Sequence, residues 1–215
     1  MFVVDGSAQE QALVYSFIRQ LVSRLDIGAD NTRIAVVNSR QPHVQINLND
    51  YVDKSLLLNA IDSLAPLTTT AAVETALQVV RQDVTLPLEA GESPRPTVVF
   101  VIVPDSLDLD DASIVSEFQM LVTSTRQVML LLYGNTQSDV IKNEQGGNLV
   151  SSPPQQNLLL YASAEALLLT SVVNDVITLL CQHIPSRLTN LSSHALSIII
   201  QDKQTNKLPR FEGSN

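Results

Sequence analysis

The sequence has few of the residues that mark several common classes of protein. Its 215 residues include one cysteine and no tryptophan, and only 4% are aromatic. A single cysteine excludes a disulfide within the chain, and the few aromatic residues mean that a large core must be aliphatic. Basic residues are outnumbered 13 to 22 and form no run, so the net charge is −9. This charge argues against nucleic acid and anionic membranes as partners.

Long apolar runs and the usual catalytic motifs are also missing. No apolar run reaches the roughly 18 residues that a membrane span needs. No Walker loop or G-x-G-x-x-G follows an expected strand, and there is no G-x-S-x-G elbow. The three histidines fall on an expected edge strand, a helix end and the tail: His43, His183 and His194. A hydrolase using Ser7 would therefore lack a base, so we expect that the protein is not an enzyme and keep a hydrolase as the less favoured alternative.

What the sequence contains is an alternation of apolar strands and amphipathic helices. Strands are expected at 2–4, 32–37, 97–103, 127–133 and 157–161, several of them continuously apolar, as in a buried parallel sheet. Helices are expected at 11–25, 53–64, 73–82, 108–122, 137–143 and 164–183. Residues 43–48 alternate apolar and polar, which predicts a half-exposed antiparallel edge strand. The predicted fold class is therefore α/β, a doubly wound, mostly parallel sheet with one antiparallel edge strand and helices on both faces.

Carboxylates and hydroxyls directly follow two of these strands. Asp5 and Ser7 follow the first strand, and Asp105 and Ser106 follow the strand at 97–103. Ligands of open α/β sheets bind in the crevice beyond the carboxyl ends of the strands, so these residues are candidates for a ligand site. The alternative is that Asp5 and Ser7 only cap the next helix. The spacing alone leaves both interpretations open.

Three stretches carry a more specific pattern. Phe-Val-Val-Asp-Gly-Ser lies at 2–7, and a helix-to-strand passage at 25–37 continues into Asn-Leu-Asn-Asp-Tyr at 47–51. Tyr-Gly-Asn at 133–135 precedes a long helix that ends near Cys181. In this order they resemble a von Willebrand factor type A domain of the extracellular matrix branch, as in matrilins and type VI collagen. The resemblance implies a domain over 2–184, followed by a tail or the start of another segment at 185–215.

The resemblance also implies a metal-ion-dependent adhesion site (MIDAS) at the C-terminal edge of the sheet, where oxygen ligands hold Mg²⁺, Ca²⁺ or Mn²⁺. The candidate ligands here are Asp5, Ser7, Thr70 and Asp105. Gln9, however, replaces the second serine of the family motif, and Ala71 stands where a threonine is expected. Pro-Asp-Ser at 104–106 replaces Thr-Asp-Gly. We therefore expect a degenerate site, and the alternative is a vestigial one whose aspartates bond loop amides and water.

The function implied by the resemblance is that of a non-enzymatic adhesion or scaffold module, secreted into an extracellular matrix. Its partners would be collagen, other matrix proteins or sibling domains of the same parent chain. The partner-binding face would contain Gln9, Thr69 and Ser106. The alternative is an intracellular scaffold, which a natural start at Met1 would suit, whereas a domain excised from a longer protein with an added methionine suits the matrix.

Two further residues bear on this location. In the extracellular branch, a cysteine at the position of Cys181 commonly pairs with one just before the first strand, and we expect such a partner upstream of residue 1. The alternative is a buried free thiol on an apolar helix face. Asn190-Leu191-Ser192 is a glycosylation sequon, which has a meaning only in a secreted protein.

Overall fold

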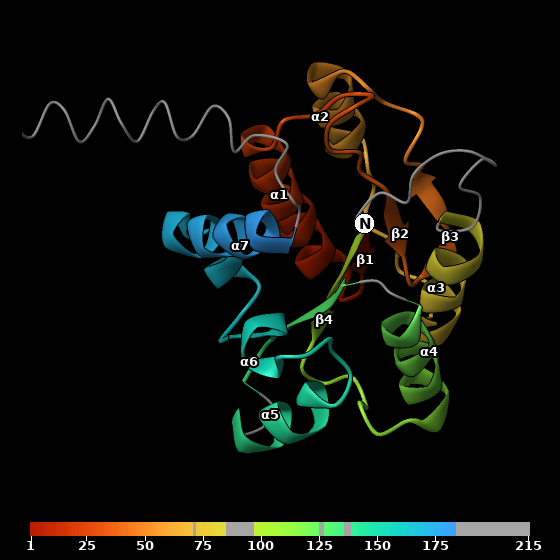
Figure 1. Cartoon of the computed structure of the whole chain (residues 1–215), viewed down its shortest axis with the longest axis vertical. Coiled ribbons are helices and arrows are strands. Elements are labelled where there is room, and N and C mark those ends of the chain that lie inside the picture. The colour runs from red at the N-terminus through yellow and green to blue at the C-terminus, as the bar shows by residue number, and fades with distance from the viewer. Residues whose placement is uncertain (71, 85–96, 125–126, 136–138, 184–215) are drawn as a thin grey trace, which may run out of the picture. The chain divides into compact units, whose positions relative to one another are not determined.

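The computed structural model describes residues 1–183 apart from 71, 85–96, 125–126 and 136–138. Within these ranges six strands form one sheet in the order β3-β2-β1-β4-β5-β6 (Figure 1). The parallel strands are β1 (Phe2–Val4), β2 (Val36–Asn38), β4 (Val98–Pro104), β5 (Gln127–Tyr133) and β6 (Leu158–Tyr161). Strand β3 (Gln41–Ile46) pairs antiparallel with β2 at the edge. The predicted fold class is confirmed.

Helices cover both faces of the sheet (Figure 1). One face carries α1 (Ala8–Arg24), α2 (Lys54–Asp62), the 3-10 segment η2 (Glu165–Leu168) and α7 (Thr170–His183). The other face carries α3 (Val73–Val79), which continues into the π-helical segment η1 (Val80–Val84), and α4 (Ala112–Thr123). Helices α5 (Asp139–Gly147) and α6 (Pro154–Asn157) connect β5 to β6. The described residues thus form a three-layered α/β domain.

The alternation of side chains along each strand divides the core into two apolar clusters. On β4, Phe100 and Ile102 pack in the cluster under α1 and α7, whereas Val99, Val101 and Val103 pack in the cluster under α3 and α4. Each of these side chains is at most 1% exposed. Because both faces are covered, every position of the strand must be apolar, which explains the continuous apolar run at 97–103.

Strand β2 differs from its predicted position. The strand was expected at 32–37, but it is a ladder of three residues, Val36–Asn38. Thr32 makes only an isolated bridge with Ile27, and residues 33–35 carry no ladder pairing. The shift brings Asn38, and the turn that follows it, to the C-terminal edge of the sheet.

Some helical segments also differ from expectation. The helix predicted at 164–183 is interrupted at Leu169, which is extended (ψ 133) and separates η2 from α7. Leu56 was expected to face inward but is 57% exposed, whereas Leu57 and Ile61 of α2 are buried as expected. The predicted loop over 146–156 contains the end of α5 and the start of α6.

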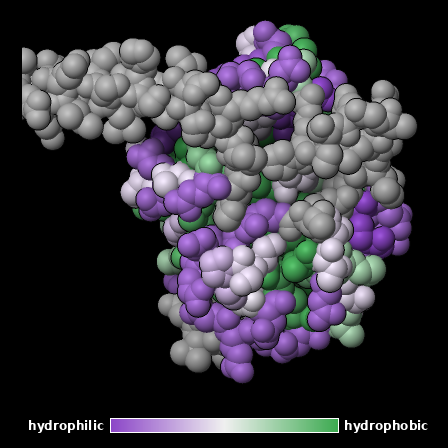
Figure 2. Space-filling model, in the orientation of Figure 1, coloured by the Kyte–Doolittle hydropathy of each residue, from purple (hydrophilic) through white to green (hydrophobic). Residues whose placement is uncertain are grey.

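Figure 2 shows hydrophilic residues over most of the visible face, with hydrophobic residues gathered in a strip beside α4. In the part of the chain that the structure describes, no helix is long and apolar enough to cross a membrane. Cys181 lies on α7 and is exposed, so the alternative of a buried thiol is wrong. The sequon at Asn190, the proposed boundary at 184 and the segment 185–215 lie outside the described residues.

Candidate functional site at the C-terminal edge of the sheet

The two predicted aspartates lie at the same edge of the sheet. Strands β1 and β4 are adjacent and parallel, with Val4 opposite Ile102, so the turns that follow them begin at one edge. Asp5 and Asp105 are 5% and 2% exposed. The hydroxyl of Tyr133 donates to the Asp5 carbonyl at 2.8 Å, and the Tyr133 carbonyl accepts from the Asp105 N–H at 2.9 Å. Tyr133 thereby ties both turns to the end of β5, while the role of the aspartates as metal ligands stays a prediction.

Two glycines make this close approach of the turns feasible. Gly6 has a φ of 133° and Gly134 a φ of 132°, in a region that side chains disfavour. A Cβ on Gly6 would overlap the Tyr133 hydroxyl, and one on Gly134 would overlap the carboxylate of Asp105. Both positions therefore need glycine on grounds of conformation and of space.

Ser7 begins helix α1 with a capping box. Its Oγ accepts the Glu10 N–H at 3.3 Å, and the Glu10 carboxylate accepts the Ser7 N–H at 2.7 Å. The interpretation of Ser7 as a helix cap is therefore confirmed. For Asp5 that interpretation is wrong, because its carboxylate contacts the turn that follows β2.

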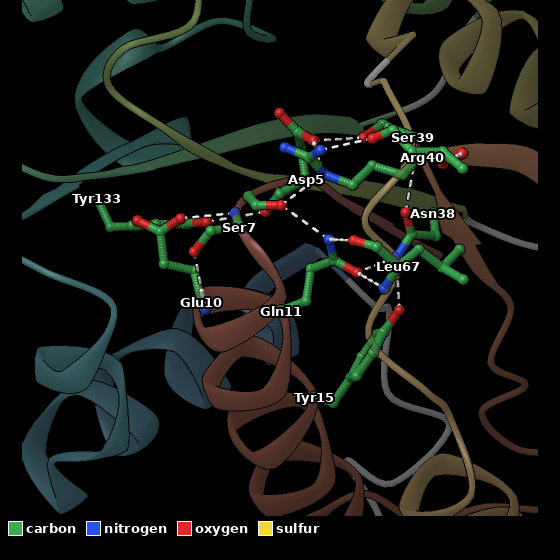
Figure 3. Close-up of polar contacts among 12 residues, drawn as sticks. Asp5, Ser7, Glu10, Gln11, Tyr15, Asn38, Ser39, Arg40, Leu67 and Tyr133 are labelled. Atoms are coloured by element: carbon green, nitrogen blue, oxygen red, sulfur yellow. Dashed lines mark hydrogen bonds and ion pairs between the residues drawn. The ribbon is translucent and has the colours of Figure 1, made fainter.

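The partners of the Asp5 carboxylate are a hydroxyl and a guanidinium (Figure 3). Ser39 Oγ donates to Asp5 Oδ1 at 2.5 Å, and Arg40 Nε lies 3.7 Å from the same oxygen. Arg40 also donates to the carbonyls of Gly6 (2.7 Å) and Thr69 (2.6 Å). The Thr69 hydroxyl returns a hydrogen bond to the Arg40 carbonyl. The turn after β2 thus joins the β1 turn to the loop before α3.

A buried glutamine completes this arrangement. Gln11 is fully buried, and its amide nitrogen donates to the carbonyls of Gly6 (2.7 Å) and Leu67 (2.9 Å). Its amide oxygen accepts from the Leu67 N–H (2.9 Å) and from Asn38 Nδ2 (2.8 Å). Two donors and two acceptor positions are therefore satisfied. We call Asp5, Gln11, Asn38, Ser39 and Arg40 the polar network (Figure 3).

Sequence reasoning missed most of the polar network. The predicted strand ended at residue 37, so the Asn-Ser-Arg triplet at 38–40 was assigned no role. The usable signal was that a polar triplet follows a strand next to β1 in a parallel sheet, which places it at the same edge. Gln11 gave no such signal, since a glutamine in the first turns of an amphipathic helix is ordinarily at the surface.

Beside the polar network lies a groove of about 270 Å³. It is lined by Ser7, Gln9, Glu10, Leu13, Tyr133, Gly134 and residues 162–165. Gln9, one of the predicted partner-binding residues, is exposed in this groove. Thr69, Ser106 and the candidate ligand Thr70 are exposed outside it.

Tyr133 lies in the lining of this groove with a raised pKa. Burial is the largest cause, followed by the negative charges of Glu10 and Asp5, so its hydroxyl remains a neutral hydrogen-bond donor to the Asp5 carbonyl.

Comparison with known proteins assigns the chain to a family. Residues 1–114 match the family model of the von Willebrand factor type A domain. The chain belongs to the von Willebrand factor type A (VWA) domain family. Matrilin-3 of Mus musculus is 32% identical over 121 residues, which is 53% of this chain and 25% of that protein. The chain thus spans about a quarter of the length of the curated relatives it matches.

Solved structures with the VWA fold are similar as well. Proximal thread matrix protein 1 from the mussel byssus, with a zinc-occupied MIDAS motif, has a TM-score of 0.63 at 23% identity over 84% of this chain and 44% of its own. Manganese-loaded TRAP protein of Plasmodium vivax has a TM-score of 0.56 at 16% identity over 80% of this chain and 71% of its own. At these identities the likeness shows the fold, and it confirms the predicted architecture.

The residues at this edge fit a divalent ion poorly. Asp5 already accepts a hydroxyl and faces a guanidinium, and Ser7 is engaged as a helix cap. Among the described residues, no third His, Cys, Asp or Glu joins Asp5 and Asp105 to make a metal-binding group of these residue types. Gln9 contributes no carboxylate or hydroxyl. The departures from the family motif are accompanied by a positive side chain of the chain itself, because the guanidinium of Arg40 lies beside Asp5.

Proposed function

We propose that this VWA domain is a non-enzymatic adhesion or scaffold module of an extracellular matrix, which binds protein partners through the groove at the C-terminal edge of its sheet. The similarity to matrilin-3 and to a thread matrix protein supports the matrix location. The single observation that carries the binding face is the groove itself, since it lies at the sheet edge where ligands of α/β folds bind.

The charge of the groove limits the chemistry of the partner. Glu10 and Glu165 line it, and the whole chain carries a net charge of −9. A basic or neutral protein surface complements such a groove, whereas an acidic one is repelled. Collagen, another matrix protein or a sibling VWA domain of the same parent chain is the proposed partner.

The chemistry of the groove supports a binding role rather than catalysis. The hydroxyl of Ser7 accepts a helix N–H, and no histidine is among the residues that line the groove. A serine nucleophile needs an adjacent base, which this arrangement of described residues does not supply. The proposed activity is therefore recognition alone.

Binding to immobilised matrix proteins tests this proposal. We would compare the unaltered chain with Gln9→Arg, which places a long cation in the groove, on purified collagens and on a matrix extract. Gln119→Arg is the matched control, because Gln119 is exposed on α4, on the opposite face of the sheet. We expect the affinity to fall at least tenfold for Gln9→Arg and to be unchanged for Gln119→Arg. Equal binding by all three chains would refute the groove, and the absence of binding to every matrix protein would refute the function.

A further inference from the structure

The cation that the structure holds beside Asp5 is the guanidinium of Arg40. Its Nε lies 3.7 Å from Asp5 Oδ1 and donates to the Gly6 carbonyl, while Nη1 donates to the Thr69 carbonyl. These acceptors belong to the turn after β1 and to the loop before α3, and Arg40 itself follows β2. One positive group thus joins three segments of the edge, as a metal ion with ligands from several loops would (Figure 3).

We propose that Arg40 takes the place of the divalent ion in this VWA domain, so that the edge is built, and binds its partner, without a metal. The part about the partner rests on the proposed function, whereas the exclusion of the metal does not. An arginine keeps its charge at every physiological pH, so it cannot lose a proton to make room for a second cation. A divalent ion at Asp5 would therefore face a fixed like charge only a few ångströms away.

The burial of the pair distinguishes it from an ordinary surface salt bridge. The Asp5 side chain is 6% exposed and that of Arg40 is 22% exposed. A carboxylate so far removed from water needs a compensating charge and hydrogen bonds. Ser39 and Arg40 supply both, because each contacts Asp5 Oδ1. Oδ1 of this carboxylate thus receives a hydrogen bond and a compensating charge from the chain itself.

Titration with Mn²⁺ alone tests the exclusion. Calorimetry would compare the unaltered chain with Arg40→Ala and with Arg40→Gln. The glutamine variant keeps more of the side-chain length and replaces the alanine variant if that one folds poorly. Arg33→Ala is the control, because Arg33 donates hydrogen bonds to Ala29 and Asn49, and Asp5 is not among its hydrogen-bond or ion-pair partners in the described part of the chain. We expect at least tenfold tighter Mn²⁺ binding in the Arg40 variants than in the unaltered chain and Arg33→Ala. Adding Asp5→Asn to either variant should abolish that gain.

Several results would overturn the proposal. Mn²⁺ binding by the unaltered chain as tight as by the Arg40 variants would show that Arg40 does not exclude the ion. If neither variant gained affinity for Mn²⁺, the missing hydroxyl ligands, and not Arg40, would be what prevents Mn²⁺ binding. Repeating the matrix-binding assay with EDTA separates this inference from the proposed function. Binding that EDTA abolishes contradicts the inference alone, and a lack of matrix binding contradicts the proposed function while the Mn²⁺ result still stands.

Discussion

Two glutamines of helix α1 show how differently the two halves of the sheet edge are built. Gln11 is fully buried in the polar network and makes four hydrogen bonds, whereas Gln9, two residues earlier, is exposed in the groove. Residues two positions apart on a helix do not face each other. The same residue type thus supports the structure at one position and is available to a partner at the other.

The comparison extends to the whole edge. In the polar network, the donors and acceptors of three segments are paired within the chain, so substitutions there should mainly lower the free energy of unfolding. The groove also contains exposed side chains such as Gln9, and substitutions of these should mainly change partner binding. Single substitutions on the two sides of this division should therefore differ in their effect on stability.

Gln11→Ala should have the largest effect. It leaves the N–H and carbonyl of Leu67 without their Gln11 partner, at a cost of about 3 kcal/mol for such buried groups. It also removes one of two hydrogen bonds from the Gly6 carbonyl, which keeps Arg40, and from the Asn38 amide, which keeps Tyr15. For a domain of this size, the melting temperature should fall by roughly 6–12 °C. Thermal melts followed by circular dichroism measure this change. A fall below about 2 °C would mean that the polar network does not support the edge.

Gly134→Ala should lower the free energy of unfolding by about 2–3 kcal/mol. The φ of 132° at this position is unfavourable for alanine, and the new Cβ would overlap the Asp105 carboxylate. Gly147→Ala is the matched control, since a Cβ there meets Pro154 at an ordinary 3.7 Å. Urea unfolding curves of the two variants give both free energies. If the two variants were equally stable, the close approach between β5 and the β4 turn would be wrong.

The origin of these effects explains what the sequence could and could not predict. Strands buried on both faces leave a continuous apolar run, so β5 was predicted to the residue and β4 to within one. Asp5 and Asp105 were found because they directly follow such strands. Arg40 was not predicted, because it follows a strand of only three residues and its long side chain contacts Gly6 and Thr69, which are 34 and 29 positions away in the sequence. Contacts of that kind depend on tertiary packing, which a local pattern does not encode.

Tyr133→Phe should lower stability by about 1 kcal/mol, because it removes one buried hydrogen bond to the Asp5 carbonyl. The raised pKa of Tyr133 adds a pH dependence. A folded-state pKa above the unfolded value of 10.0 gives stability that is fully present below pH 10 and is lost as the pH rises further. The unaltered chain should therefore lose more stability above pH 10 than Tyr133→Phe does. Urea unfolding at pH 8 and pH 10.5 measures the difference, and parallel losses in both chains would contradict it.

Gln9→Ala should have the smallest effect on stability, below about 0.5 kcal/mol, because an exposed substitution removes little contact area. It is also the matched partner of Gln11→Ala, with the same change of residue on the same helix. The double variant should lose only the sum of the two single effects, because residues that share no partner contribute independently. Urea unfolding of the four chains gives the coupling free energy. A coupling well above about 0.5 kcal/mol would mean that the groove and the polar network are one unit, and a partner bound at Gln9 would then also alter the stability of the edge.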